Sequence, residues 1–202
     1  MSDRNVLKIA VIGPAFSGKS TLCNTIAGRM LCMEYDTTIG VDLIVKHFDN
    51  NGIKYKLLLW DTAGQERFNS IVQPYIERMP VILYCYSGSE YISFIKMIQR
   101  YETDRDKGIL DDKHIVVCMC KSDSVDKLNR VDILGQEFAE TYGYDFIATS
   151  STIKSGLIEL LYSLTKKEKK FLETDSLLNK IKEPIRKQSY IENIKSWNCN
   201  IL

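Results

Sequence analysis

A glycine-rich segment near the N-terminus has the spacing of a phosphate-binding loop. Residues 13–20 read Gly-Pro-Ala-Phe-Ser-Gly-Lys-Ser, which matches the pattern G-x-x-x-x-G-K-[S/T]. Gly13 and Gly18 allow the backbone to curl, so that successive N–H groups can point at a polyphosphate. The amine of Lys19 would reach the outer phosphates, and the hydroxyl of Ser20 would bind Mg²⁺. The motif therefore predicts a nucleotide site that uses magnesium.

A second set of residues has the types needed to transfer a phosphoryl group to water. The loose transition state of that reaction requires charge neutralisation and a positioned water more than a strong base. Gln65 suits the orientation of this water, and Gly64 leaves room for a backbone N–H beside the terminal phosphate. Asp61 can hold Mg²⁺ through water, whereas Thr38 can bind the ion only when the terminal phosphate draws its segment inward.

These residues follow apolar runs that alternate with helical patterns. The runs typical of strands are residues 7–12, 55–60, 81–86, 115–119 and 145–149. Helical spacing covers residues 20–30, 90–101, 131–142 and 156–171. Residues 42–49 and 53–60 flank an Asn-Gly turn, which predicts a hairpin. The pattern predicts an α/β fold of the P-loop NTPase type: a six-stranded, mainly parallel sheet with one antiparallel edge strand, helices on both faces, and ligands beyond the carboxyl strand ends.

Composition excludes several classes of protein. The chain has 202 residues, with 27 Lys and Arg, 26 Asp and Glu and 45% hydrophobic residues, as expected of a globular domain rather than a collagen-like or disordered chain. Its longest apolar stretch, residues 81–86, is far shorter than the ~20 residues that span a bilayer. The N-terminus also lacks the apolar core of a signal peptide. These features predict a cytosolic protein.

The cysteines are expected to be free thiols. They are Cys23, Cys32, Cys85, Cys118, Cys120 and Cys199. A chain of this length without a signal peptide is expected to remain in a reducing compartment. Cys118 and Cys120 are separated by one residue, and no histidine pair stands at zinc-finger distance from them. We therefore expect buried thiols that bind no metal.

Charge is distributed unevenly along the chain. Residues 166–202 hold 9 basic and 5 acidic side chains, whereas residues 1–165 hold 18 basic and 21 acidic ones. The acidic body argues against nucleic acid as a partner, and the basic end suits an anionic surface. The apolar pattern weakens after about residue 174, so we predict a globular domain over residues 1–174 and a flexible basic tail over residues 175–202.

Two segments resemble the small Ras-like GTPases, and the Rab family in particular. Residues 35–42, Tyr-Asp-Thr-Thr-Ile-Gly-Val-Asp, are similar to the first switch of Rab proteins, and residues 56–68 are similar to the second. The resemblance covers residues 7 to about 165. It implies a monomeric switch that binds GTP or GDP with Mg²⁺, hydrolyses GTP slowly through Gln65, and meets effectors, exchange factors and activating proteins through both switches. It also implies regulation of vesicle traffic at the cytoplasmic face of an intracellular membrane, with exchange into the cytosol.

The motifs and the resemblance together define the residues expected at the nucleotide. The expected metal ligands are Ser20, Thr38 and Asp61. The residues expected at the phosphates are Gly13, Ala15, Phe16, Ser17, Gly18, Lys19, Ser20, Thr21, Tyr35, Thr38 and Gly64. Those expected at guanine are Lys121, Asp123, Ser150, Ser151 and Thr152, although the last three replace the Ser-Ala-Lys of relatives.

The guanine-binding motif departs from the family pattern. The resemblance predicts Asn-Lys-x-Asp where residues 120–123 read Cys-Lys-Ser-Asp. Asp123 preserves guanine preference, because its oxygens pair with the N1–H and N2–H₂ donors of guanine, whereas adenine presents an acceptor at N1. Cys120 lacks an amide that bonds base and loop in relatives, and Leu31 stands where an aromatic usually meets guanine. Two lost contacts of roughly 1 kcal/mol each predict fast nucleotide exchange.

The phosphate loop itself carries an unusual side chain. Phe16 stands where many relatives have glycine, so its ring must point away from the phosphates. There it would restrict an incoming arginine finger, while Ala15 adds a methyl group near the terminal phosphate. Hydrolysis is therefore expected to be slow even with an activating protein.

The chain ends in a candidate lipidation motif. Its last four residues, Cys-Asn-Ile-Leu, match C-a-a-X with Cys199 as the prenylated residue, and a terminal Leu favours geranylgeranyl transfer. One lipid chain needs a second signal for stable membrane attachment. Attraction to anionic lipid could supply it through Lys180, Lys182, Arg186, Lys187 and Lys195.

Two alternatives remain open on the sequence. The altered base motif and loop would also suit a GTP-binding scaffold or signalling protein with little or no hydrolysis. The loop alone would suit an ATP-dependent kinase or ATPase, provided that Asp123 has no role in choosing the base.

Overall fold

The sheet of this protein has the predicted strand arrangement. The strands are β1 (Val6–Ile12), β2 (Val41–Asn50), β3 (Ile53–Thr62), β4 (Val81–Ser87), β5 (His114–Cys120) and β6 (Asp145–Ala148). They form one sheet in the order β2-β3-β1-β4-β5-β6, in which β2 runs antiparallel to β3 and all other neighbours are parallel. The six-stranded, mainly parallel sheet with one antiparallel edge strand is thereby confirmed.

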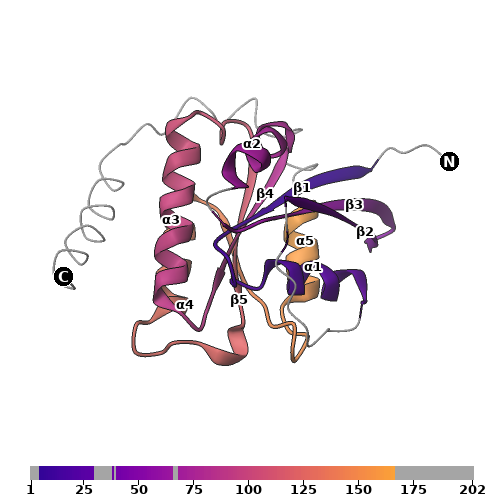
Figure 1. Cartoon of the computed structure of the whole chain (residues 1–202). Helices are drawn as coiled ribbons and strands as arrows, with labels where there is room; N and C mark the ends of the chain where they lie inside the picture. The colour runs from indigo at the N-terminus through magenta and orange to yellow at the C-terminus, as the bar shows by residue number, and fades with distance from the viewer. Residues whose placement is uncertain (1–4, 30–37, 39, 66–67, 167–202) are drawn as a thin grey trace, which may run out of the picture.

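The computed structural model describes residues 5–29, 38, 40–65 and 68–166 (Figure 1). The predictions for Leu31, Tyr35, Cys199 and the tail over residues 175–202 lie outside these residues. Within them, no helix combines the length and the hydropathy needed to cross a membrane.

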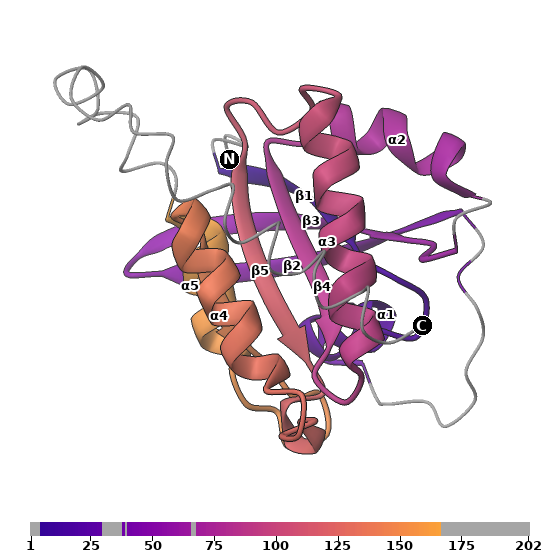
Figure 2. The ribbon, with the colours of Figure 1, turned by 90° about the vertical axis from the view of Figure 1, so that its left-hand side faces the viewer.

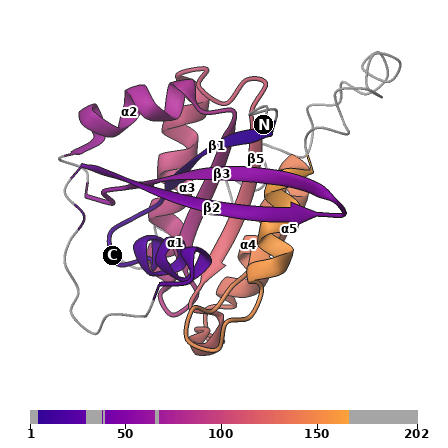
Figure 3. The same cartoon turned by 90° about the vertical axis from the view of Figure 1, so that its right-hand side faces the viewer.

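Helices cover both faces of the sheet. They are α1 (Lys19–Ala27), α2 (Asn69–Arg78), α3 (Tyr91–Asp106), α4 (Val131–Tyr142) and α5 (Leu157–Thr165), with a 3₁₀ turn at Ser122–Ser124. α1 and α5 pack on one face through Leu22 and Leu160. α2, α3 and α4 pack on the other face through Ile76, Phe94 and Phe138. α3 lies in front of the sheet in Figure 2, and Figure 3 shows the opposite side, where the hairpin of β2 and β3 crosses in front of α5.

The helices differ from the sequence prediction in four places. α5 ends at Thr165, before the predicted residue 171, and Lys166 caps it. The apolar pattern did not predict α2, because Pro74 lies inside this helix and proline removes a backbone donor. α1 ends before the predicted residue 30, since Gly28 takes a left-handed conformation and caps the helix. α3 extends beyond the predicted residue 101, where Arg100 and Asp104 form an ion pair one turn apart.

The predicted site residues lie where parallel strands end. The phosphate loop follows β1, and Asp61 is the penultimate residue of β3. Lys121 follows β5, and Ser150 lies two residues beyond β6. These strand ends meet at one edge of the sheet, which is where an open parallel sheet binds its ligands.

Candidate functional site

The predicted phosphate loop joins β1 directly to α1. Gly13 has a φ of 155°, and the carbonyl oxygen of Cys85 on β4 occupies the space that a Cβ would need. Gly18 has a φ of 101°, a conformation that side-chain-bearing residues rarely adopt. The path of the backbone therefore requires both glycines, and it directs the N-terminus of α1 toward the site.

Lys19 is buried behind this loop. Its Nζ donates hydrogen bonds to the carbonyl of Pro14 at 2.8 Å and to the hydroxyl of Ser17 at 3.4 Å. Burial lowers the pKa of the amine, and the neighbouring Asp61 carboxylate opposes this shift. A Cβ added to Gly64 would lie only 2.7 Å from the Nζ atom. The segment after β3 therefore passes directly over the loop, and the structure brings Gly64 and Lys19 together.

The three predicted metal ligands also meet. The Oγ of Ser20 is 3.0 Å from the Oγ1 of Thr38, which donates to the Oδ2 of Asp61 at 3.4 Å. Asp61 is 2% exposed, and its Oδ1 has no hydrogen-bond partner among the described residues. Burial raises the pKa of this carboxyl. Mg²⁺ is a hard cation that binds oxygen ligands. The buried carboxylate oxygen of Asp61 and the two neighbouring hydroxyls are ligands of this kind, so the three residues fit the ion.

The remaining residues predicted at the phosphates differ in exposure. Phe16 is 74% exposed and has a φ of 61°, so its ring lies in solvent rather than in the core. Ser17 is buried, whereas Ala15 and Thr21 are half-buried. Gln65 is half-buried next to Gly64, and its carbonyl accepts the N–H of Phe68 at 3.0 Å.

The base-binding motif begins where β5 ends. The Nζ of Lys121 donates to the carbonyl of Phe16 at 2.9 Å, which ties the motif to the phosphate loop. Asp123 is exposed, and its carboxylate accepts hydrogen bonds from the hydroxyls of Ser150 and Ser124. The hydrogen bond from Ser150 holds the pKa of Asp123 below its ordinary value. The carboxylate therefore stays ionised, which is the form that accepts two donors from guanine.

The loop after β6 supplies the partner of Asp123. Ser150 is buried, and its Oγ accepts the N–H of Ile153 at 3.2 Å while donating to Asp123. Its backbone N–H donates to the carbonyl of Ser155 at 3.1 Å, which closes the loop. Ser151 is half-buried and Thr152 is exposed in the same turn. The structure thus brings the two predicted parts of the base site together through Ser150.

Cys120 lies beneath the phosphate loop. It is 3% exposed, and a Cβ added to Gly18 would lie 3.1 Å from its own Cβ. Its backbone carbonyl accepts the N–H of Gly88 at 2.7 Å. The thiol offers no amide to the loop, and the link between loop and motif comes instead from Lys121. The sequence alone did not reveal this hydrogen bond.

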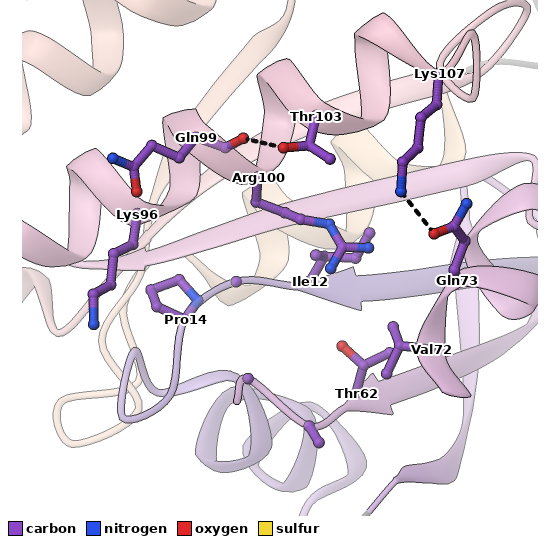
Figure 4. A pocket seen from close by; sticks show the side chains of 13 residues that line it. Ile12, Pro14, Thr62, Val72, Gln73, Lys96, Gln99, Arg100, Thr103 and Lys107 are labelled. Carbon is purple, nitrogen blue, oxygen red and sulfur yellow. Dashed lines mark hydrogen bonds between the residues drawn. The ribbon is translucent and has the colours of Figure 1, made fainter. Parts of the chain in front are cut away.

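A pocket of about 220 Å³ lies beside the loop, between α2 and α3 (Figure 4). The side chain of Arg100 reaches into it from α3, and that of Lys107 from the residue directly after α3 (Figure 4). Arg100 is paired with the buried Asp104 at 2.9 Å, and Lys107 donates to Gln73 on α2 at 2.9 Å. The sequence prediction missed this pocket, although the basic residues at positions 96 and 100 have a spacing that puts them on one helix face.

Together, the fold and the loop define a P-loop nucleotide-binding protein of the α/β class. A model of the Ras family matches residues 8–170 of the chain. The chain is 30% identical over 174 residues to the Ras-related protein SEC4 of Saccharomyces cerevisiae, which covers 86% of this chain and 80% of SEC4. It is 30% identical over 160 residues to the Ras-related protein Rab-15 of Mus musculus, with 79% and 75% covered. It is 29% identical over 164 residues to the GTP-binding protein ypt1 of Schizosaccharomyces pombe, with 81% and 80% covered.

The chain belongs to the Ras family, as a Rab-type small GTPase. Membership makes it a GTP-hydrolysing enzyme and does not favour the alternative of a scaffold with little hydrolysis. The predicted resemblance is thereby confirmed.

Proposed function

We propose that this protein is a GTP/GDP-cycling switch that regulates vesicle traffic, with Mg²⁺ as its cofactor. The main support for this proposal is that Ser20, Thr38 and Asp61 contact one another beside the phosphate loop. Thr38 lies 18 residues after Ser20 in the sequence. Its contact with Ser20 therefore links the position of Thr38 to the nucleotide bound at the phosphate loop. When bound, Mg²⁺ would neutralise phosphate charge, as it does in phosphoryl transfer generally.

The other residues have separate roles in this proposal. The ammonium group of Lys19 binds the outer phosphates, and the backbone N–H of Gly64 faces the terminal phosphate. Gln65 orients the attacking water. At the other end, Asp123 selects guanine, Lys121 lies along the base, and the loop at residues 150–152 closes over it. Slow hydrolysis is expected because Phe16 projects from the loop into the path of an arginine finger.

The proposed cellular setting rests on the tail and on the relatives. We propose a GTPase domain over residues 1–174 and a basic tail over residues 175–202 that is prenylated at Cys199. This arrangement would place a monomeric protein at the cytoplasmic face of an intracellular membrane, in exchange with the cytosol. Its partners would be effectors, exchange factors and activating proteins that contact the two switches, and it would bind no nucleic acid.

Single-turnover hydrolysis of bound GTP tests the switch. The unchanged protein is expected to release phosphate in a magnesium-dependent reaction that Gln65→Leu slows by about 100-fold, since positioning of the water supplies most of the rate. Gln136→Leu, at an exposed glutamine on α4, serves as the control and should leave the rate unchanged. Hydrolysis that does not depend on Gln65, or displacement of bound GDP by ATP, would contradict the proposal.

A further inference from the structure

Three sulfur atoms lie together in the core beneath the phosphate loop. The Sγ atoms of Cys85, Cys118 and Cys120 are all within 4.8 Å of one another. Each of these residues is 3% exposed or less. The roles proposed above for nucleotide binding and hydrolysis use none of the three sulfurs.

The register of the sheet brings these cysteines together. Cys85 on β4 stands directly opposite Cys118 on β5 in the parallel ladder. Cys120 follows two residues later, and side chains two residues apart on a strand share a face. All three therefore point to the face covered by α1 and α5, where Cys23 also lies. The sequence does not reveal this cluster, because α3 separates β4 from β5 along the chain.

Three sulfurs at these separations suit a soft cation with few ligands. A metal–sulfur bond of about 2.3 Å places three sulfurs about 4.0 Å apart in a trigonal site, so small rotations of the side chains would suffice. Structural zinc almost always takes four ligands, whereas thiolates also select Cu(I). Among the described residues, no fourth cysteine, histidine or carboxylate joins the group.

A positive side chain lies near two of the three sulfurs. A buried anion is costly unless a positive group lies near it. The ammonium of Lys19 lies close enough to interact electrostatically with both Cys85 and Cys120.

Although the spacing of the cysteines along the chain led us to expect no metal, we propose from their arrangement in space that Cys85, Cys118 and Cys120 form a three-coordinate binding site for one Cu(I) ion beneath the phosphate loop. Each thiol that binds the ion releases its proton to solvent, and no electron is transferred. The bound ion would link β4 to β5 directly behind Gly18. Cys120 already limits the space for a side chain at Gly18. Binding of the ion is expected to raise the melting temperature, because it stabilises only the folded chain.

A competition titration tests the site. The full chain, with Cys32→Ser and Cys199→Ser to remove sulfurs outside the described residues, is loaded with GDP and titrated without oxygen. Cu(I) is supplied as its coloured bicinchoninate complex, and the loss of colour reports transfer to the protein. We expect one Cu(I) per chain. Cys120→Ser and Cys118→Ser should each weaken Cu(I) binding by more than about tenfold. Even residues that only hydrogen-bond to a metal ligand change metal affinity by about this factor. Cys23→Ser, at a buried cysteine outside the cluster, should leave binding unchanged.

X-ray absorption at the copper edge provides a second test that needs no variant in the cluster. Three sulfur neighbours at about 2.3 Å are expected around copper. Two sulfurs, nitrogen or oxygen ligands, or Zn²⁺ binding more tightly than Cu(I) would overturn the proposal. So would binding that survives Cys120→Ser in a variant with a folded circular dichroism spectrum. None of these outcomes depends on GTP hydrolysis, so failure of this site and failure of the proposed switch are distinguishable.

Discussion

The phosphate end and the base end of the site hold their polar groups in different ways. At the phosphate end, Lys19 and Asp61 are 5% and 2% exposed, and the loop and neighbouring hydroxyls surround them. At the base end, Asp123 is exposed at a 3₁₀ turn, and Ser150 is its main anchor. Cys120 stands where the resemblance to Rab proteins predicts an asparagine with a bonding amide.

This difference shows where binding energy should be concentrated. Buried charged groups are positioned by the core and act in a low dielectric, so their contacts with a ligand are strong and costly to lose. An exposed carboxylate competes with water and contributes less. We therefore expect the phosphate end to dominate affinity and the base end to set selectivity and the rate of release.

The largest expected effect is at the phosphate end. Lys19→Ala should weaken GDP binding by more than about 100-fold, because charge-assisted hydrogen bonds to phosphate are worth about 1.5–3 kcal/mol each. Calorimetric titration of GDP measures this loss. Lys8→Ala, at an exposed lysine on β1, is the control and should not change affinity. If Lys19→Ala weakens GDP binding less than Asp123→Ala does, the base end rather than the phosphate end dominates affinity.

A change at the base end should alter selectivity as well as affinity. Asp123→Ala removes both acceptors for guanine, so GDP affinity should fall by roughly tenfold and the preference for GDP over ADP should largely disappear. Competition of ADP against a fluorescent GDP analogue measures both quantities. Asp111→Ala removes another exposed carboxylate and should change neither. Retained discrimination would show that Asp123 does not contact the base.

Restoring the family residue beneath the loop should slow release of the nucleotide. Cys120→Asn adds an amide where relatives have one, and a recovered contact of about 1 kcal/mol corresponds to roughly fivefold slower loss of GDP. Stopped-flow release of a fluorescent GDP analogue measures the rate. Cys120→Ala supplies no amide and should not slow release. Equal rates for the unchanged protein and Cys120→Asn would show that the link from Lys121 to Phe16 already replaces the missing amide.

The smallest expected effect concerns the strain in the loop. Phe16 has a φ of 61° and is mostly exposed, so Phe16→Gly should relieve backbone strain at little loss of burial. The free energy of unfolding should rise by about 1 kcal/mol, as measured by urea denaturation with GDP bound. Leu128→Gly, at a side chain that is 95% exposed and has no such backbone strain, should bring no gain.

Local spacing in the sequence was sufficient to predict much of this molecule. The loop at residues 13–20, the hairpin at Asn51 and Gly52, and the strand-helix alternation each depend on neighbours along the chain. α2 was missed because Pro74 and a weak apolar pattern concealed it, while packing of Ile76 against the core holds it in place. Tertiary contacts can override local propensity in this way.

The amino-acid types and their local spacing specify the chemistry available to this chain: a phosphate loop, a carboxylate for guanine, and hydroxyls and a carboxylate for a hard cation. Which of these groups come into contact depends on the fold. The contact of Thr38 with Ser20, the bond from Lys121 to Phe16 and the approach of Cys85 to Cys118 join residues that are distant in the sequence. The physical reason is the order and register of the strands, because long-range pairing sets which side chains share a face and which strand ends meet.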